Sequence, residues 1–291
     1  MNRRFGAADG LLLLTTLVWG VNFPIGKYVL GFMSPMPFAF FRFLFAAALL
    51  MLLLAWRGGV AISWRDAAKL AGLGFIGITL FQTMWSNGLA LTTASKAAIL
   101  VNASPIWAAV YSSFGKNPPT RRAWFGIAVS LAGVFLVINN SLTALNIGGG
   151  SFAGDMLLLF GSAFWAAYST LAGPFLTRLG PLRFTAWSML FGALCLLPLA
   201  LPGALAMDYA AIPLRAYLGY GYTIVLSNAL GFLWWYESIR QLGVTRAMVY
   251  SYLIPLFAIG TAVIFLGEPF SLVQLIGSAV VLAGIRLARG A

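Results

Sequence analysis

Apolar stretches of about 20 residues follow one another along nearly the whole chain, and this pattern restricts the possible folds most strongly. As a helix, each stretch is long enough to cross a hydrocarbon core roughly 30 Å thick. Hydrophobic residues make up 61% of the 291 positions and charged residues only 8%, whereas soluble domains carry about 25% charged residues. The chain has too few polar side chains to cover a soluble globule, so we predict a polytopic membrane protein.

The predicted fold class is an all-α polytopic membrane protein with ten transmembrane helices. Continuous apolar runs exclude a β-barrel, because barrel strands are shorter and alternate between apolar and polar residues. Glycine, proline and charged residues separate the runs from one another. The ten predicted spans lie near residues 8–29, 37–56, 67–89, 94–114, 122–139, 154–175, 183–201, 213–236, 244–266 and 271–288.

Lysine and arginine are distributed unevenly between the two sides that these spans define. The formal net charge is +12, but with a cytoplasmic N-terminus only Lys27, Lys96 and Arg215 fall in outside segments, and Arg42 lies within the second span. Because cytoplasmic loops carry an excess of Lys and Arg, this asymmetry predicts that both termini are cytoplasmic. The basic excess thus reflects membrane topology, and we expect a lipid bilayer, not nucleic acid, as the partner.

The residues that most enzymes and metal sites require are scarce. Histidine is absent and Cys195 is the single cysteine, so the chain lacks the commonest metal ligand and the usual general base, and it forms no intrachain disulfide. The composition therefore predicts no metal, no cofactor and no enzymatic activity. The six carboxylates all fall at span ends or in loops; they are Asp9, Asp66, Asp155, Asp208, Glu237 and Glu268.

The two halves of the chain are related in sequence. An offset of 146 residues pairs Trp19 with Trp165, Asp9 with Asp155 and Pro35 with Pro181, and an offset of 150 pairs Pro105 with Pro255, Lys96 with Arg246 and Trp85 with Trp235. The seam is an uncharged stretch rich in Asn, Gly and Ser. We predict a first five-helix repeat at 1–140, an external linker at 141–153 and a second five-helix repeat at 154–291.

Five is an odd number, so the second repeat must enter the membrane with the opposite orientation to the first. Inverted repeats of this kind form the framework of many secondary transporters, whose substrate sites lie near the bilayer midplane at the repeat interface. The alternative is a duplication that serves stability only. The repeat pattern favours a transporter with its site between the two halves.

Two pairs of repeat-related residues fall at mid-membrane depth. Trp19 and Trp165 each follow an aspartate by ten residues, which is about 15 Å of helix and roughly half the hydrocarbon thickness. The same reasoning places Pro105 and Pro255 near this depth, where each proline frees the carbonyl four residues earlier and kinks its helix. A simple packing kink is the alternative for each proline.

Neutral polar and aromatic residues share helix faces with these anchors. The spacing predicts that they line a cavity for an amphipathic organic solute with little net charge, although an amide in a membrane can also bridge helices structurally. Arg42 is predicted to have a structural role near the outer end of its span. The predicted substrate-binding residues are Trp165, Tyr168, Asn102, Tyr252, Gln82, Asn228, Trp19, Asn22, Trp85 and Ser251.

No carboxylate falls at mid-depth, whereas a proton-coupled carrier usually keeps an ionisable group within the membrane. Glu237 is the one doubtful case, and Arg240, three residues further on, favours an ordinary surface pair. The sequence therefore predicts transport down a gradient, without proton or sodium coupling.

Four segments carry a family resemblance: "LVWGVNFPIGK", "PFAFFRFLFAA", "ALTTASKAAILVNASPIWAAV" and "LGEPFSLVQLIGSAVVLAGI". Along its whole length the chain resembles the drug/metabolite transporter superfamily, EamA-type, and within it the YddG-type amino-acid exporters. The resemblance implies two inverted five-helix repeats, a bacterial inner-membrane location and export of amino acids by alternating access. We expect a small-molecule substrate, namely aromatic and other apolar neutral amino acids, and a monomer. The alternative is a broad-specificity drug or metabolite exporter, with or without proton coupling.

Overall fold

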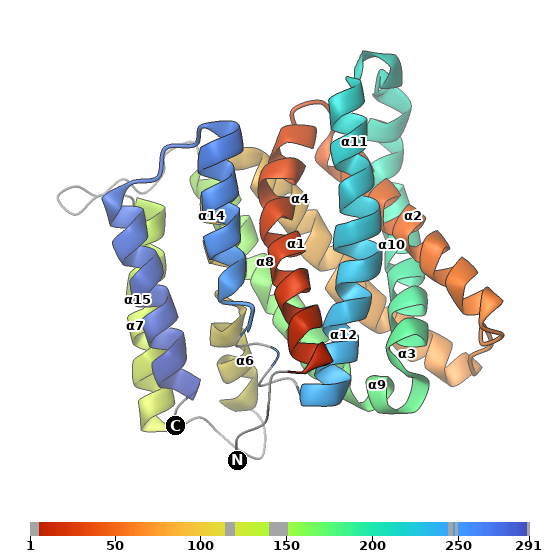
Figure 1. The fold of residues 1–291 in the computed structure, drawn as a ribbon, viewed down its shortest axis with the longest axis horizontal. Helices are drawn as coiled ribbons and strands as arrows, with labels where there is room; N and C mark the ends of the chain where they lie inside the picture. Colours follow the sequence, from red (N-terminus) through yellow and green to blue (C-terminus); the bar gives the residue numbers. More distant parts are fainter. Residues whose placement is uncertain (1–5, 114–119, 140–150, 244–246, 248–249, 290–291) are drawn as a thin grey trace.

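The computed structural model describes residues 6–113, 120–139, 151–243, 247 and 250–289, and over these residues the chain is a bundle of helices without a strand (Figure 1). The helices of the first half are α1 (Ala7–Val29), α2 (Pro35–Trp56), α3 (Trp64–Gly74), α4 (Phe81–Leu91), α5 (Ala94–Val101), α6 (Ser104–Ser113) and α7 (Arg121–Asn139). A π-helical segment, η1 (Phe75–Leu80), joins α3 to α4 without interruption.

The second half resembles the first in the order of its long helices and has in addition the short helix α9 and the turn η2. Its helices are α8 (Phe152–Leu171), α9 (Gly173–Leu179), α10 (Pro181–Ala206), α11 (Leu214–Tyr222), α12 (Gly231–Leu242), α14 (Leu253–Leu266) and α15 (Leu272–Arg289). A short 3₁₀ turn, η2 (Tyr209–Ala211), precedes α11, and a second π-helical segment, η3 (Thr223–Leu230), joins α11 to α12. The related halves thus each carry a π-helical segment in the third long helix.

Local sequence signals set the helix starts in both halves. Pro35 and Pro181 occupy the first positions of α2 and α10, where a missing N–H costs nothing because that group has no intrahelical partner. Ser63 and Thr93 cap α3 and α5: the hydroxyl of Ser63 accepts from the backbone N–H of Asp66 at 3.1 Å, and that of Thr93 accepts from Lys96 at 3.2 Å.

Four of the described helical stretches are long and apolar enough to cross a membrane: α1, α2, the continuous run Trp64–Leu91 and α10. A fifth is obtained if α8 and α9, which meet at an angle of 44°, count as one span. The predicted span 94–114 is divided in the structure, because α5 ends at Val101 and α6 begins at Ser104. The fourth helix of the second half is interrupted similarly at residues 251–252, just before α14.

Both helix interruptions precede the prolines that the sequence singled out. The break in the first half lies at residues 102–103, and Pro105 follows it by two residues; the break in the second half lies at 251–252, and Pro255 follows it by three. A proline clashes with the carbonyl four residues earlier, which for these two prolines falls at or beside the break. The side chain of Pro105 lies outside the described residues, whereas Pro255 is buried.

Helices of one half pack against helices of the other. The first helix of each half contacts the fourth of the other, α1 against α14 and α8 against α5 and α6, while α2 pairs with α10 and α7 with α15. In Figure 1 the α7–α15 pair forms one edge of the bundle. Because these contacts alternate between halves, the bundle is a single interlocked unit and not two adjacent domains.

Glycines allow the closest of these contacts. A Cβ atom at Gly277 in α15 would lie 3.0 Å from the carbonyl oxygen of Gly133 in α7 and 2.9 Å from a side-chain atom of Val137. Such small residues let helix backbones approach closely in membranes. This glycine contact between α7 and α15 therefore serves packing.

We expect Gly277→Leu to lower the thermal midpoint of the detergent-solubilised protein. The new side chain would overpack the α7–α15 contact, which should lower the free energy of unfolding by about 1–3 kcal/mol or more. The matched control is Gly260→Leu, since nothing lies within 4 Å of a Cβ atom built at Gly260. Thermal unfolding followed by tryptophan fluorescence measures both variants. Equal midpoints for the two would contradict the packing role of Gly277.

The two halves run in opposite directions through the bundle. The end of α1 meets the end of α4, where the ammonium group of Lys27 donates to the carbonyl oxygens of Leu89 and Ala90 at 3.0 and 2.9 Å. The start of α8 lies at this same end, because the hydroxyl of Thr92 donates to Asp155 at 2.6 Å. The starts of α1 and α8 therefore lie at opposite ends of the bundle.

Candidate functional site

A cavity lies where the two halves meet. Its walls come from α1, α2, α4, α5, α6, α8, η3, α12, α14 and the helix breaks. About 70 Å³ of the cavity is open to the centre of a water molecule, which is room for more than one water. Eight of the ten residues predicted to bind substrate line this cavity. They are Trp19, Asn22, Gln82, Trp85, Asn102, Trp165, Asn228 and Ser251.

Two of the predicted residues do not line the cavity. Tyr168 is fully buried between helices: its hydroxyl lies 2.7 Å from that of Ser188, and its ring stacks on Phe184 and covers the backbone of Gly77. Helical spacing placed it on the same face as Trp165, but the ring points towards α10 and η1. Tyr252 lies at the break before α14 and is likewise not among the lining residues.

The centre of the cavity wall is a cluster of aromatic rings around Trp19. Trp19 and Trp165, which the repeat relates to each other, meet edge to face with ring centroids 5.6 Å apart and an interplanar angle of 82°. The rings of Trp235 and Phe232 lie 5.2 and 5.6 Å from Trp19. These geometries are favourable for aromatic pairs, so each half contributes rings to one shared surface.

Two local features fix the position of Trp19. Its indole N–H donates to the carbonyl oxygen of Ser227, 3.0 Å away, within the π-helical segment η3. Its ring occupies the space above Gly231, where a Cβ atom would lie 2.6 Å from the indole nitrogen. The wider turn of a π-helix is frequent at functional sites, and here it presents a backbone carbonyl to the cavity wall.

Polar atoms without hydrogen-bond partners among the described residues line the same cavity. The side-chain oxygen of Asn22 and the side-chain nitrogen of Asn228 are buried and make no hydrogen bond with any described residue. Asn102 differs, because its amide donates to the carbonyl oxygen of Ala98 at 2.8 Å. Buried polar groups in proteins are nearly always hydrogen-bonded to protein or water, so Asn22 and Asn228 offer one acceptor and one donor to the cavity contents.

Arg42 also lines the cavity, and sequence reasoning missed it. From the sequence it is predicted to play a structural role near the outer end of its span; in the structure it is 1% exposed and forms part of the cavity wall. Its guanidinium donates to the side-chain oxygen of Gln82 and lies 4.3 Å from the ring centroid of Trp85. The available signal was its position inside a span, because ionisable residues within a membrane are usually functional.

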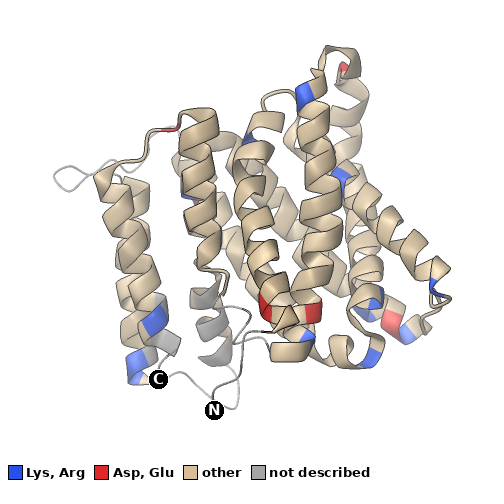
Figure 2. Cartoon of the chain, viewed as in Figure 1, with Lys and Arg blue, Asp and Glu red and all other residues tan. Residues whose placement is uncertain are grey.

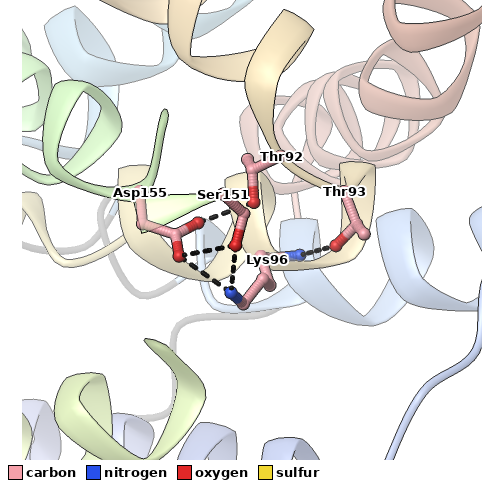
Figure 3. A network of polar contacts seen from close by, with 5 residues as sticks. All are labelled: Thr92, Thr93, Lys96, Ser151 and Asp155. Carbon is pink, nitrogen blue, oxygen red and sulfur yellow. Dashed lines mark hydrogen bonds and ion pairs between the residues drawn. The ribbon is translucent and has the colours of Figure 1, made fainter. Parts of the chain in front are cut away.

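A polar network lies at one end of the bundle, between α5 and α8 (Figure 3). The ammonium group of Lys96 in α5 lies 2.8 Å from the carboxylate of Asp155 in α8, and both side chains are buried, at 8% and 1% exposure. Thr92 donates to the same carboxylate at 2.6 Å, and Ser151 lies 3.1 Å from the ammonium group. The network joins the first half to the second.

The carboxylate of Glu268 adds further contacts at this end of the bundle. It accepts hydrogen bonds from the backbone N–H groups of Ala94 and Ser95, at 2.7 and 3.1 Å, and from the hydroxyl of Ser95 at 2.9 Å. A carboxylate at a helix N-terminus accepts hydrogen bonds from the free backbone N–H groups and interacts favourably with the positive end of the helix dipole. The loop before α15 is thereby tied to the start of α5.

At the other end of the bundle, Asp9 is the repeat counterpart of Asp155. It accepts a hydrogen bond from the hydroxyl of Tyr250 at 2.7 Å. Nearby, the hydroxyl of Ser238 donates to the carbonyl oxygen of Ala8 at 3.2 Å. Arg246, which the 150-residue offset relates to Lys96, lies outside the described residues.

The chain is a bundle of apolar helices built from two interlocked, related halves, with an aromatic and polar cavity at their junction. This is the architecture of a membrane transporter. The model of the EamA-like transporter family matches the chain twice, at residues 6–139 and 152–289. The chain therefore belongs to this family, within the drug/metabolite transporter superfamily, as the resemblance predicted. Because the members are transporters, the prediction that the chain is not an enzyme is confirmed.

Several curated relatives are similar over nearly the full length. An uncharacterized transporter of Archaeoglobus fulgidus is 30% identical, with 95% of each chain covered. The uncharacterized transporter YyaM of Bacillus subtilis is 28% identical over 96% of this chain and 92% of its own. The probable terminal-alkyne amino-acid exporter of Streptantibioticus cattleyicolor is 25% identical over 95% and 91%. A solved crystal structure with 17% identity shares the fold at a TM-score of 0.69, covering 97% of this chain and 96% of the other.

Proposed function

We propose that this transporter exports amino acids, preferably aromatic and other apolar neutral ones, by alternating access. The observation that carries the proposal is the cavity at the junction of the halves, where rings and unpartnered amide atoms line one space. The rings suit an apolar side chain, and the amide atoms suit a small polar head group. The relative named as a terminal-alkyne amino-acid exporter supports the same substrate class.

The backbone at the first helix break supplies a site for the amino group of such a solute. Val101 lines the cavity there, and because Pro105 has no N–H, the carbonyl of Val101 lacks the donor that a regular helix would supply. Carbonyl oxygens freed in this way in transporters face ligands or water. A substrate ammonium group would satisfy this carbonyl.

We further propose ten membrane spans in two inverted repeats, with both termini in the cytoplasm of a bacterial cell and the protein in its inner membrane. In Figure 1, α1 begins and α15 ends at the same end of the bundle. Figure 2 shows that most of the lysine and arginine residues drawn in colour gather at this end. An excess of basic residues marks the cytoplasmic side of membrane proteins.

Counterflow in proteoliposomes tests the proposed substrate class. Vesicles loaded with unlabelled phenylalanine are expected to accumulate labelled phenylalanine, while empty liposomes are not. Competition by a panel of neutral, acidic and basic amino acids then ranks the preference. Accumulation driven equally well by lipophilic cations that lack a carboxyl group would instead support a broad-specificity drug exporter.

We expect the transport rate to remain unchanged when a protonophore collapses the proton gradient. All six carboxylates lie in the described residues, and none of them lines the cavity. A carboxylate that carried a proton with the substrate would need access to that path. In vesicles that start with substrate outside only, accumulation of the substrate driven by an imposed proton gradient would contradict uncoupled transport.

A further inference from the structure

Arg42 is a buried cation to which the chain supplies no carboxylate. The three ion pairs among the described residues are Lys96–Asp155, Arg178–Asp66 and Arg240–Glu237. The other three carboxylates also have partners elsewhere: Asp9 accepts from Tyr250, Asp208 from the backbone of Ala210, and Glu268 from the start of α5. All six acidic side chains of the sequence are thus accounted for, and none pairs with Arg42.

The neutral neighbours of Arg42 satisfy only part of the guanidinium. One terminal nitrogen donates to the side-chain oxygen of Gln82. The faces of Trp85, Phe38 and Phe43 lie 4.3, 4.6 and 5.1 Å from its central carbon. The Nε–H is buried and has no hydrogen-bond partner among the described residues. Ring faces and one amide do not replace a counter-ion, because an uncompensated buried charge is strongly unfavourable.

The position of Arg42 relates this missing partner to the transported solute. Arg42 and its acceptor Gln82 line the cavity together with Asn22 and Asn228, so the guanidinium borders the space that a solute would occupy. A guanidinium is permanently charged and presents paired donors that match the two oxygens of a carboxylate. A carboxylate there would supply both the missing charge and the missing acceptor.

We propose that Arg42 binds the carboxylate group of the transported solute and thereby restricts the substrates to carboxylic acids and amino acids. This inference deepens the proposed function and rests on it. The solute is oriented with its carboxylate at Arg42 and Gln82. Its apolar part lies among the rings of Trp19, Trp165 and Phe232. The cavity thus selects by charge at one end and by apolar contact at the other.

Three ligands of one shape separate the contribution of the carboxylate from that of the amine: phenylalanine, phenylalaninamide, which lacks the carboxylate, and 3-phenylpropionate, which lacks the amine. Their dissociation constants are measured on the detergent-solubilised full chain by isothermal titration calorimetry. The variants are Arg42→Gln and Arg42→Lys. The matched control is Arg215→Gln, because Arg215 is exposed in α11 and away from the cavity.

We expect Arg42→Gln to weaken binding of phenylalanine and 3-phenylpropionate by roughly ten- to a hundredfold, since a charge-assisted hydrogen bond is lost. Binding of phenylalaninamide is expected to change by less than about twofold, as is binding of all three ligands by Arg215→Gln. Arg42→Lys keeps the charge but loses the paired donors, so it should weaken binding of the two carboxylates by an intermediate factor. Arg42→Lys also serves as the test if the glutamine variant does not fold.

Each outcome separates this inference from the proposed function. Equal phenylalanine affinity in Arg42→Gln and the unmodified protein would overturn the role of Arg42 and leave amino-acid export standing. The same loss for phenylalaninamide as for the two carboxylates would also overturn it, because the effect would then be structural. If 3-phenylpropionate binds in an Arg42-dependent way and phenylalanine does not bind, carboxylate recognition holds and amino-acid export fails. If neither carboxylate binds, both proposals fail.

Discussion

Trp165→Ala is expected to reduce counterflow of labelled phenylalanine by more than about tenfold, because several aromatic contacts at the cavity wall are removed together. The ring of Trp165 meets those of Trp19, Phe81 and Phe232 at centroid distances of 5.6, 5.4 and 5.6 Å. Its loss would leave a void in the wall and would remove one of the rings that pack against Trp19. The initial rate of counterflow in proteoliposomes measures the effect.

The control for this prediction is Trp64→Ala. Trp64 begins α3 and is 80% exposed, so its removal takes the same atoms from a place without contact to the cavity. Trp165→Phe keeps an aromatic ring and most of the packing. Comparing its counterflow rate with that of Trp165→Ala separates an effect of the missing ring on transport from an effect on folding. Equal and mild losses for Trp165→Ala and Trp64→Ala, with both variants folded by size-exclusion chromatography, would contradict the proposed site.

Asp155→Ala is expected to destabilise the protein by about 3–5 kcal/mol, the usual cost of removing one partner from a buried ion pair. The variant would leave the ammonium group of Lys96 buried, with Ser151 as its remaining partner in the network. The hydroxyl of Thr92 would lose its acceptor as well. Thermal or denaturant unfolding in detergent, followed by tryptophan fluorescence, measures the loss.

Two further variants assign this cost to the ion pair. The double variant Lys96→Met/Asp155→Leu removes both charges and should recover most of the stability, because apolar side chains of similar size suit a buried position. Glu237→Ala breaks the exposed pair with Arg240, in which the side chain of Arg240 is 47% exposed and that of Glu237 25% exposed. This change should lower the stability by less than about 1 kcal/mol. A double variant as unstable as Asp155→Ala would show that the cost comes from packing and not from the unpaired charge.

The meeting of Trp19 and Trp165 could be predicted from the sequence because it depends on distance along a helix. Ten residues separate Asp9 from Trp19 and Asp155 from Trp165, and the two rings do meet, 5.6 Å apart, at the junction of the halves. The rotation of each helix about its axis was less accessible. Tyr168 shows this, because a turn of helix beyond Trp165 it packs against Ser188 and Gly77 and not into the cavity.

Arg42 shows a second limit, which is the identification of partners across the bundle. The sequence reveals a cation inside the second span, but its neighbours Gln82 and Trp85 come from a different helix 40 or more residues away. Only the fold brings them together. The π-helical segments η1 and η3 are similar, since the sequence does not show that η3 presents the carbonyl of Ser227 to Trp19.

The sequence by itself determined the membrane class, the all-helical fold and the duplication, because these follow from apolar run length and from residues repeated at constant offsets. It also indicated that the two repeat-related tryptophans lie at the same level of the bundle, where their rings meet. The tertiary structure decided which faces of the helices meet, where the fourth helix of each half breaks, and that Arg42 borders the cavity without a carboxylate partner. The physical reason is that helix rotation and contact depend on close packing between segments far apart in the chain, which spacing along one helix does not specify.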